Sequence, residues 1–163
     1  MDMNLRKTFM DELTKLAEKD KRVILIVSDV GFSYIEEFAQ KFPAQFINAG
    51  VTEQAATGMA AGLALTGFKP YLYSMIPFIC FRNFEQLRND VCYNDANVKV
   101  IGVRGSTHYS FLGFSHNPNP ENEAEIILKH LPNIRIFNPK DDQQVIDVMT
   151  QSYQSENPTY IQI

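Results

Sequence analysis

Six short apolar segments alternate with helix-patterned stretches from one end of this chain to the other. The run at residues 23–27 is continuously apolar and ends in Ser28 and Asp29, which is typical of a strand buried on both faces. Strands separated by helices predict one α/β domain over residues 1–163, with a mostly parallel sheet of about six strands flanked by helices. The expected strands are 23–27, 46–47, 71–74, 98–103, 134–137 and 160–163, and the expected helices are 5–17, 34–42, 52–65, 78–93, 123–130 and 141–153.

Length, charge and composition narrow the classes of partner. The 163 residues fit one domain, and a hydrophobic content of 45% can fill its core. A net charge of −4 argues against nucleic acid as the main partner, because phosphate binding needs a basic face. Residues 1–20 mix charges with apolar residues and do not resemble a signal peptide, and no uncharged apolar run could span a bilayer. We therefore expect no nucleic-acid or membrane partner and, by default, a cytoplasmic location.

Familiar phosphate and metal motifs are absent from the sequence. Gly62 and Gly67 have P-loop spacing, but Phe68 stands where that motif needs a lysine. His108 and His116 lack further ligands at a metal-binding spacing, so we predict no metal site on this chain. The two cysteines, Cys80 and Cys92, fit no metal or redox spacing and are interpreted as buried, reduced thiols.

A long polar segment at residues 104–122 is the irregular part of the pattern. Loops of this length in compact domains are usually functional or disordered. This one contains Tyr109 and His116 and follows a predicted strand, as do residues 48–53 and 74–78. Because ligands bind beyond the carboxyl ends of parallel strands, we expect these three exits to converge on one site.

Glu53 lies in the first turn of a predicted helix whose other residues are small or apolar. A structural interpretation is close helix packing, for which Gly58 and Gly62 are suited, with the carboxylate favoured at the positive helix end. Burying a lone carboxylate is costly unless it has a partner or a function. We therefore interpret Glu53 as a functional residue.

Four segments carry a resemblance to a known family. The sequence GVTEQAATGMAAGLAL at 50–65 resembles the signature of the pyrimidine-binding domain of transketolases, and the resemblance continues in order through the rest of the chain. The further segments are RNFEQLRN at 82–89, GFSH at 113–116 and LPNIRIFNP at 131–139. The chain is most similar to the C-terminal half of split bacterial transketolases, with deoxyxylulose-phosphate synthase and the β subunits of 2-oxoacid dehydrogenases more distant.

The resemblance implies the thiamine diphosphate-binding fold and a transferase that uses thiamine diphosphate. In the family, a glutamate at the position of Glu53 hydrogen-bonds N1′ of the aminopyrimidine and is catalytic. Phe78 matches the residue that stacks on the pyrimidine, and Met75 stands where a second aromatic residue often lies. Arg82 matches an arginine of split transketolases, and His116 matches the catalytic, substrate-facing histidine. The alternatives are a core phenylalanine, a surface or ion-paired arginine and a solvated loop histidine.

The sequence departs from the family pattern beside that histidine. The family usually has Gly-Glu-Asp-Gly-x-x-His, whereas residues 110–116 are SFLGFSH. Phe111 and Leu112 replace acidic residues that contact a sugar hydroxyl in transketolase. An apolar patch there favours a less hydroxylated or differently shaped substrate.

A second domain type is needed for the implied chemistry. The family's diphosphate-binding signature, Gly-Asp-Gly followed by Asn, does not occur in this sequence. The resemblance therefore implies a partner subunit that carries it and binds most of the Mg²⁺, in a homodimer or heterotetramer; a piece of a longer chain is the alternative. The small-residue helix and residues 78–84 are candidate interfaces.

The expected reaction is transfer of a two-carbon ketol unit between sugar or sugar-phosphate substrates. We expect this activity only when the chain is assembled with its diphosphate-binding partner. The alternatives are a carboligase component that decarboxylates a 2-oxoacid, similar to deoxyxylulose-phosphate synthase, and a non-catalytic regulatory subunit.

Overall fold

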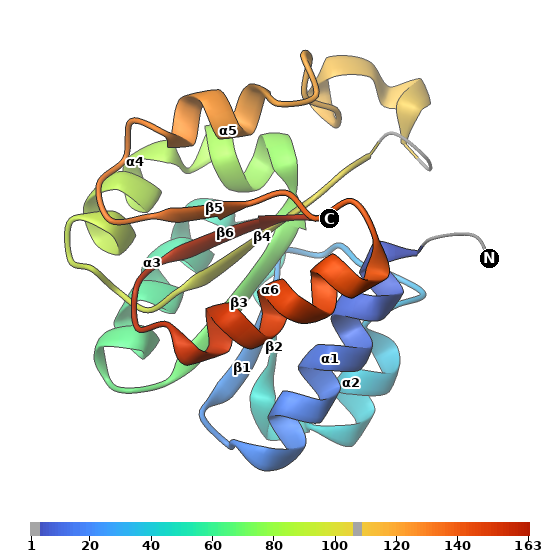
Figure 1. Ribbon diagram of the computed structural model, residues 1–163, viewed down its shortest axis with the longest axis vertical. Helices are drawn as coiled ribbons and strands as arrows, with labels where there is room; N and C mark the ends of the chain where they lie inside the picture. The colour runs from blue at the N-terminus through green and yellow to red at the C-terminus, as the bar shows by residue number, and fades with distance from the viewer. Residues whose placement is uncertain (1–3, 106–108) are drawn as a thin grey trace.

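A six-stranded, entirely parallel sheet forms the centre of the molecule (Figure 1). The computed structural model describes residues 4–105 and 109–163. The strand order is β2-β1-β3-β4-β6-β5, so the chain changes direction across the sheet between β1 and β3. The strands are β1 Val23–Val27, β2 Phe46–Asn48, β3 Lys69–Met75, β4 Lys99–Val103, β5 Arg135–Phe137 and β6 Thr159–Gln162. The predicted fold class is confirmed, and the sheet is wholly rather than mostly parallel.

Helices cover both faces of the sheet and create two separate cores. One core contains residues from α1 Leu5–Lys19, α2 Glu36–Lys41 and α6 Asp142–Gln154, and α1 and α6 lie side by side in Figure 1. The other contains residues from α3 Glu53–Leu65, α5 Glu123–Leu128 and the helical segments around α4 Phe84–Gln86. The molecule is therefore a three-layer α/β/α sandwich.

The continuous apolar runs of the sequence follow from this arrangement. In β1, Leu25 belongs to the core under α1, while Ile24 and Ile26 belong to the core under α3. Successive strand side chains point to opposite faces, and both faces are covered, so every position is apolar. Ala56 and Ala60 are fully buried where α3 meets the sheet, which small side chains allow at close range.

The prediction of one continuous helix over residues 78–93 is wrong. The chain instead forms two π-helical segments, Pro77–Arg82 and Leu87–Cys92, on either side of the short α4. The wider turns of a π-helix accommodate an extra residue and interrupt the regular ladder. Asn83 lies at this interruption with φ −113° and is fully buried, where its side-chain amide donates to Thr57 Oγ1. The regular helix is therefore interrupted at Asn83, where the buried side chain bonds to Thr57.

The other predicted elements are present with shifted ends. The helix predicted at residues 34–42 is shorter, and a 3₁₀ turn, Pro43–Gln45, follows it. The segment at 104–122 contains a 3₁₀ stretch, Ser110–Ser115. Both cysteines are buried and unpaired, and burial raises the pKa of each thiol to about 12. In the described residues, no helix is sufficiently long and apolar to cross a membrane.

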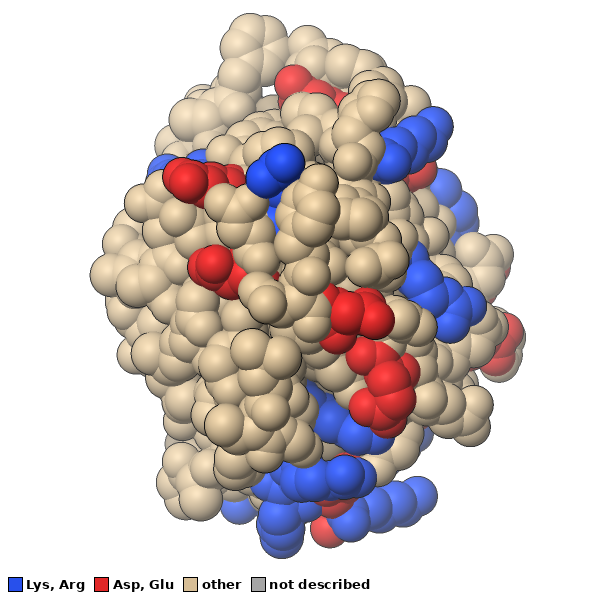
Figure 2. Space-filling model, turned by 90° about the vertical axis from the view of Figure 1, so that its left-hand side faces the viewer, with Lys and Arg blue, Asp and Glu red and all other residues tan. Residues whose placement is uncertain are grey.

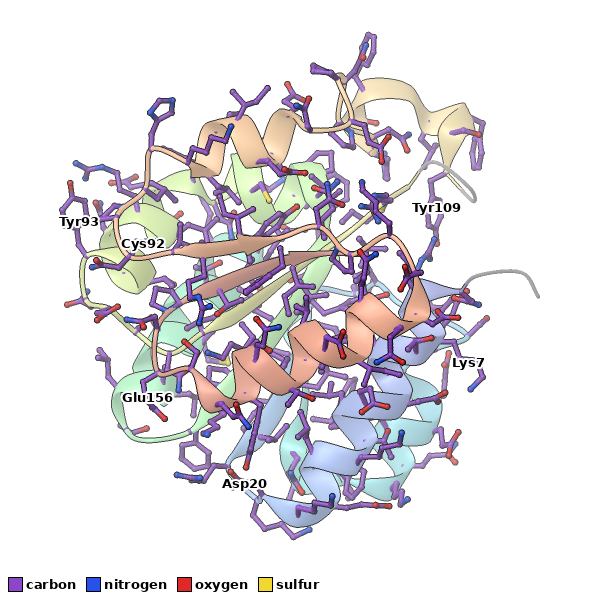
Figure 3. All side chains as sticks on the ribbon, viewed as in Figure 1. Lys7, Asp20, Cys92, Tyr93, Tyr109 and Glu156 are labelled. Atoms are coloured by element: carbon purple, nitrogen blue, oxygen red, sulfur yellow. The ribbon has the colours of Figure 1, made fainter. Side chains whose placement is uncertain are left out.

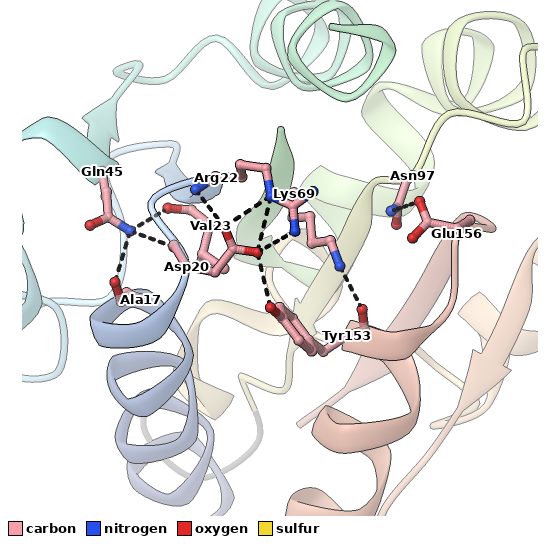
Figure 4. A network of polar contacts seen from close by, with 9 residues as sticks. All are labelled: Ala17, Asp20, Arg22, Val23, Gln45, Lys69, Asn97, Tyr153 and Glu156. Atoms are coloured by element: carbon pink, nitrogen blue, oxygen red, sulfur yellow. Dashed lines mark hydrogen bonds and ion pairs between the residues drawn. The ribbon is translucent and has the colours of Figure 1, made fainter. Parts of the chain in front are cut away.

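Polar contacts fix the end of the sheet where the strands begin (Figure 4). Gln45 Nε2 donates to three carbonyl oxygens, at 2.9 to 3.3 Å. The Arg22 guanidinium beside Asp20 holds the pKa of that carboxyl well below its usual range, and Tyr153 also donates to Asp20. Lys69 Nζ donates to the Tyr153 carbonyl at 3.0 Å. These groups hold the loops at one end of the sheet and leave the opposite end for the candidate site.

Candidate active site

Three segments meet at the carboxyl edge of the sheet, as the sequence predicted. They follow β2, β3 and β4, next to the point where the strand order changes direction between β1 and β3. Such a switch point is the usual ligand site of an open parallel sheet. Figure 3 shows Tyr109 at this end of the molecule, and Tyr93 and Glu156 at the opposite end.

Glu53 is the first residue of α3, and its burial is nearly complete at 2% exposure. Thr52 precedes it with a non-helical φ of −138°, and its hydroxyl donates to the Ala49 carbonyl instead of capping the helix. The carboxylate therefore supplies the negative charge at the positive end of the helix. The sequence predicted this position, in the first turn of a small-residue helix.

The Glu53 carboxylate has one partnered oxygen and one without a partner. Its Oε2 accepts a hydrogen bond from Arg82 Nη1 at 2.9 Å, which forms an ion pair. Its Oε1 is buried and has no hydrogen-bond partner among the described residues. Buried polar atoms are normally satisfied, and an exception calls for an explanation such as a missing ligand. One carboxylate oxygen is therefore available to a hydrogen-bond donor.

Phe78 connects this ion pair to the histidine of the long segment. The guanidinium carbon of Arg82 lies 4.1 Å from the centre of the Phe78 ring. The His116 ring meets the Phe78 ring edge-on, at 4.9 Å between centroids and 73° between planes. Glu53, Arg82, Phe78 and His116 thus form one connected group, although they come from three different strand exits.

Met75 lies deeper, at the last position of β3, and is 4% exposed. It pairs in register with Val103 of β4, and Gly105 follows two residues later. A Cβ atom on Gly105 would lie 2.8 Å from Met75 Cε and 2.7 Å from the backbone oxygen of His116. Met75 therefore packs beneath the chain that carries His116. Gly105 was not predicted as a site residue, because its close contacts leave no local pattern in the sequence.

A hydrogen-bonded turn positions His116. The chain kinks at Gly113, whose φ of 63° favours glycine. Asn117 Nδ2 donates to the carbonyls of Tyr109 and Gly113, at 2.9 Å each, and ties the turn together. Ser115 Oγ lies 2.7 Å from His116 Nδ1, so the ring is held from its own segment. The richness of this loop in asparagine is visible in the sequence, whereas the bracing contacts of Asn117 are not. His108 lies outside the described residues.

A second set of contacts joins α3 to the segment after β3. Asn83 donates to Thr57 Oγ1, and Thr57 Oγ1 donates to the carbonyl of Glu53 at 2.7 Å. Gln54 Nε2 donates to the Arg82 carbonyl at 3.2 Å. These bonds fix the backbone of Arg82 relative to the start of α3. Asn83 and Thr57 were not predicted as supports, because the π-helical turns that place them together were not predicted.

Two hollows in the described part of the surface are lined by other residues than this group. One hollow, of about 790 Å³, lies between α1 and α2, and its lining includes none of the predicted site residues. A smaller one, about 200 Å³, lies beside the site and is lined by Arg104, Gly105, Asn117, Pro118 and Glu121. The described residues contain no group of three or more His, Cys, Asp or Glu side chains that could hold a metal ion. The described part of the site offers a carboxylate oxygen, an aromatic ring and an imidazole.

Comparison with known proteins identifies relatives of the whole chain. The family model described as "Transketolase, pyrimidine binding domain" matches residues 1–163. One of the subunits of apulose-4-phosphate transketolase from Phocaeicola vulgatus is 33% identical over 159 residues, which are 97% of this chain and 50% of that protein. The 1-deoxy-D-xylulose-5-phosphate synthase of Listeria monocytogenes is 36% identical over 152 residues, which are 88% of this chain and 23% of that protein.

A solved structure supports the same relationship. The structure titled "Split gene transketolase, inactive beta4 tetramer" superimposes with a TM-score of 0.84 and 29% identity, over 98% of this chain and 51% of that one. This chain therefore spans about half the length of the split-transketolase relatives and about a quarter of the synthase.

Proposed function

This chain belongs to the transketolase pyrimidine-binding domain family, and we propose that it is the pyrimidine-binding subunit of a split, transketolase-like transferase. The observation that carries the proposal is the half-satisfied, buried carboxylate of Glu53 beside the aromatic ring of Phe78. The similarity to one subunit of an apulose-4-phosphate transketolase supports it.

The residues at the site fit the aminopyrimidine of thiamine diphosphate. A protonated ring nitrogen needs a carboxylate acceptor, and Glu53 Oε1 is an acceptor without a partner among the described residues. A flat aromatic ring needs an apolar surface, and Phe78 offers one next to that carboxylate through their shared contact with Arg82. A carboxylate that shares a proton with a ring nitrogen interacts most strongly in a dry pocket, and the side chain of Glu53 is 2% exposed.

Thiamine diphosphate, when bound, would supply the electron sink needed to break and form a carbon–carbon bond beside a ketone. Glu53 would hold the proton at the pyrimidine nitrogen, while Phe78 would orient the ring. His116 would face the substrate and hold or move a proton at one of its hydroxyl oxygens. Met75 would complete the cofactor site by packing under the loop that carries His116, and Arg82 borders this site through its ion pair with Glu53.

A partner subunit is part of this proposal. It would carry the Gly-Asp-Gly and Asn signature and bind the diphosphate and Mg²⁺, in a heterotetramer or homodimer of the cytoplasm. The outer surface of α3 is a candidate interface: its exposed apolar side chains include Met59 at 42% and Leu65 at 62% exposure. Figure 2 shows the side of the molecule where α3 and α4 lie, and its charged side chains form scattered groups with uncharged areas between them.

The loop beside His116 supports a proposal for the substrate class. We propose transfer of a two-carbon ketol unit between sugar or sugar-phosphate substrates, with fewer hydroxyl contacts than transketolase makes. Phe111 and Phe114 are 80% and 79% exposed, and Leu112 lies between them. A second candidate is decarboxylation of a 2-oxoacid and transfer of its two-carbon unit to an aldehyde. The 36% identity to a deoxyxylulose-phosphate synthase favours that candidate, and a non-catalytic role is a third.

Co-purification with a protein that carries the diphosphate-binding signature tests the proposal. We expect thiamine diphosphate and Mg²⁺ to bind tightly to the complex and weakly to each chain alone. Glu53→Gln should abolish turnover of ketose phosphate or of pyruvate with an aldehyde, and the two substrate sets separate the two reactions. Glu85→Gln is the matched control, because Glu85 is exposed on the adjacent α4. A fully active Glu53→Gln complex would refute the assignment.

A further inference from the structure

Arg82 contacts the same two side chains that an entering aminopyrimidine would use, although it bonds Oε2 of Glu53 and leaves Oε1 without a partner among the described residues. Its Nη1 donates to Glu53 Oε2 at 2.9 Å, and its guanidinium carbon lies 4.1 Å from the centre of the Phe78 ring. A guanidinium is planar, stacks on aromatic faces and presents N–H donors at its edge. An aminopyrimidine held by Glu53 and Phe78 would be planar, would stack and would present an N–H donor. The two groups have the same requirements at the same site.

Because one guanidinium both covers a face of Phe78 and bonds to Glu53, we take that face as the one from which Glu53 is reached. A ring that stacks on Phe78 while bonding to Glu53 has to lie on that same side. The guanidinium and the pyrimidine therefore compete for the space over this face of Phe78.

The Arg82 side chain is able to leave while its backbone stays in place. The side chain is 45% exposed, so one side of it already faces solvent. The carbonyl of Arg82 accepts from Gln54, and the neighbouring Asn83 is anchored on Thr57. Rotation of a long side chain about its own bonds leaves these contacts intact, and exposed side chains change rotamer rapidly.

We propose that Arg82 is a placeholder for the pyrimidine, which keeps Glu53 paired in the cofactor-free chain and moves aside when the ring enters. The inference rests on the proposed function, because it assumes that thiamine diphosphate is the ligand. An unpaired buried carboxylate would be costly, and Arg82 removes that cost before the ligand arrives. The same contact lowers the apparent affinity for the ligand, since the binding-competent arrangement is a minor one.

The placeholder role predicts opposite effects of one substitution on stability and affinity. Arg82→Met keeps an unbranched apolar side chain but removes the guanidinium. The cofactor-free chain should become less stable, with a melting temperature lower by several degrees. The complex with the partner should bind thiamine diphosphate more tightly, by about 10-fold, because no group has to be displaced. A residue that contacts the bound cofactor would change affinity in the other direction.

The inference is tested by isothermal titration calorimetry, in which thiamine diphosphate is added in the presence of Mg²⁺ to the assembled complex and its affinity is measured. Arg88→Met is the matched control: Arg88 also covers an aromatic ring, Tyr93, at 4.7 Å, but lies away from Glu53. Tighter binding by Arg82→Met and unchanged binding by Arg88→Met would support the placeholder. Equal or weaker binding by Arg82→Met, with normal binding by the wild type, would overturn the placeholder and leave the proposed function standing. If neither the wild-type complex nor the Arg82→Met complex binds thiamine diphosphate, both the placeholder and the proposed function are overturned.

A second measurement avoids dependence on the folding of the variant. The Nε–H signal of Arg82 is followed by NMR in the wild-type complex, with its assignment supported by Arg82→Lys. We expect saturating thiamine diphosphate to shift this signal toward that of a solvated arginine. An unchanged signal at saturation would show that Arg82 keeps its place beside Glu53, and would refute the inference.

Discussion

Lys99 gives a prediction whose magnitude can be worked out from the structure. It is the first residue of β4 and is fully buried. Its Nζ donates to the carbonyls of Ser155 and Asn157, at 2.9 and 3.0 Å. Burial lowers the pKa of Lys99 from 10.5 to about 7, and Lys69 also lowers it, while Glu156 acts in the opposite direction.

The lowered pKa makes stability depend on pH in a defined direction. Below about pH 7 both the folded and the unfolded chain carry a protonated Lys99, so this residue contributes no slope. Between pH 7 and 10.5 the unfolded state still binds that proton and the folded state does not, so the free energy of unfolding rises with pH. From roughly pH 6 to 8.5 the gain is about 2 kcal/mol.

Lys99→Met should remove this slope while it keeps most of the side-chain volume. The assay is urea unfolding of wild type and variant at several pH values, with exposed Lys129→Met as the control. The upper pH limit matters because burial raises the pKa of the Cys80 and Cys92 thiols to about 12. Above the pKa of an unfolded cysteine, the unfolded chain loses these thiol protons while the folded chain keeps them. The free energy of unfolding then falls as pH rises, which opposes the effect of Lys99. A wild-type slope equal to that of Lys99→Met would refute the reasoning and show that the two carbonyls keep the ammonium charged.

Three further substitutions test packing and hydrogen bonding at the site, on α3 and at the opposite end of the sheet. Gly105→Ala should lower the free energy of unfolding by about 1–3 kcal/mol, because the added Cβ meets the His116 backbone. Gly62→Ala, where a Cβ meets nothing within 4 Å, should instead stabilise α3 by about 0.5–1 kcal/mol, and equal effects in denaturant unfolding would contradict this account. Gln45→Ala should cost about 1–3 kcal/mol, since three carbonyls lose a donor, while exposed Gln40→Ala should change the same unfolding curve little.

The regular elements were predictable because their patterns are local. A strand buried on both faces has no polar position, and the run at 23–27 shows that directly. The order of elements then determines a parallel sheet, since parallel strands need crossover connections. The exact ends were less accessible: β3 begins at Lys69, two residues before the predicted start at residue 71, and the Nζ of Lys69 reaches the Tyr153 carbonyl. Tertiary contact thus overrode the local signal.

The irregular helix after β3 explains why Glu53 was not predicted as the partner of Arg82, for which an ion pair was one of the alternatives. The partners are separated by 29 residues, and regular helical periodicity does not place Arg82 beside α3. The π-helical segment ends at Arg82, and Asn83 turns inward to Thr57. The sequence identified each of Glu53, Phe78, Arg82 and His116 as a candidate through the family resemblance. Their mutual contacts required the structure.

The two halves of the site rest on different kinds of support, and this bears on substrate choice. Glu53, Met75 and Phe78 lie on or directly beside regular elements, which hold them from the sheet and from α3. His116 instead lies on a 3₁₀ turn with the exposed Phe111 nearby. Loops tolerate substitution better than packed elements. The proposed substrate contacts are therefore able to change without disturbing the proposed cofactor contacts. Exchange of residues 110–115 for the acidic family pattern should accordingly alter KM for ketose phosphates more than the affinity for thiamine diphosphate.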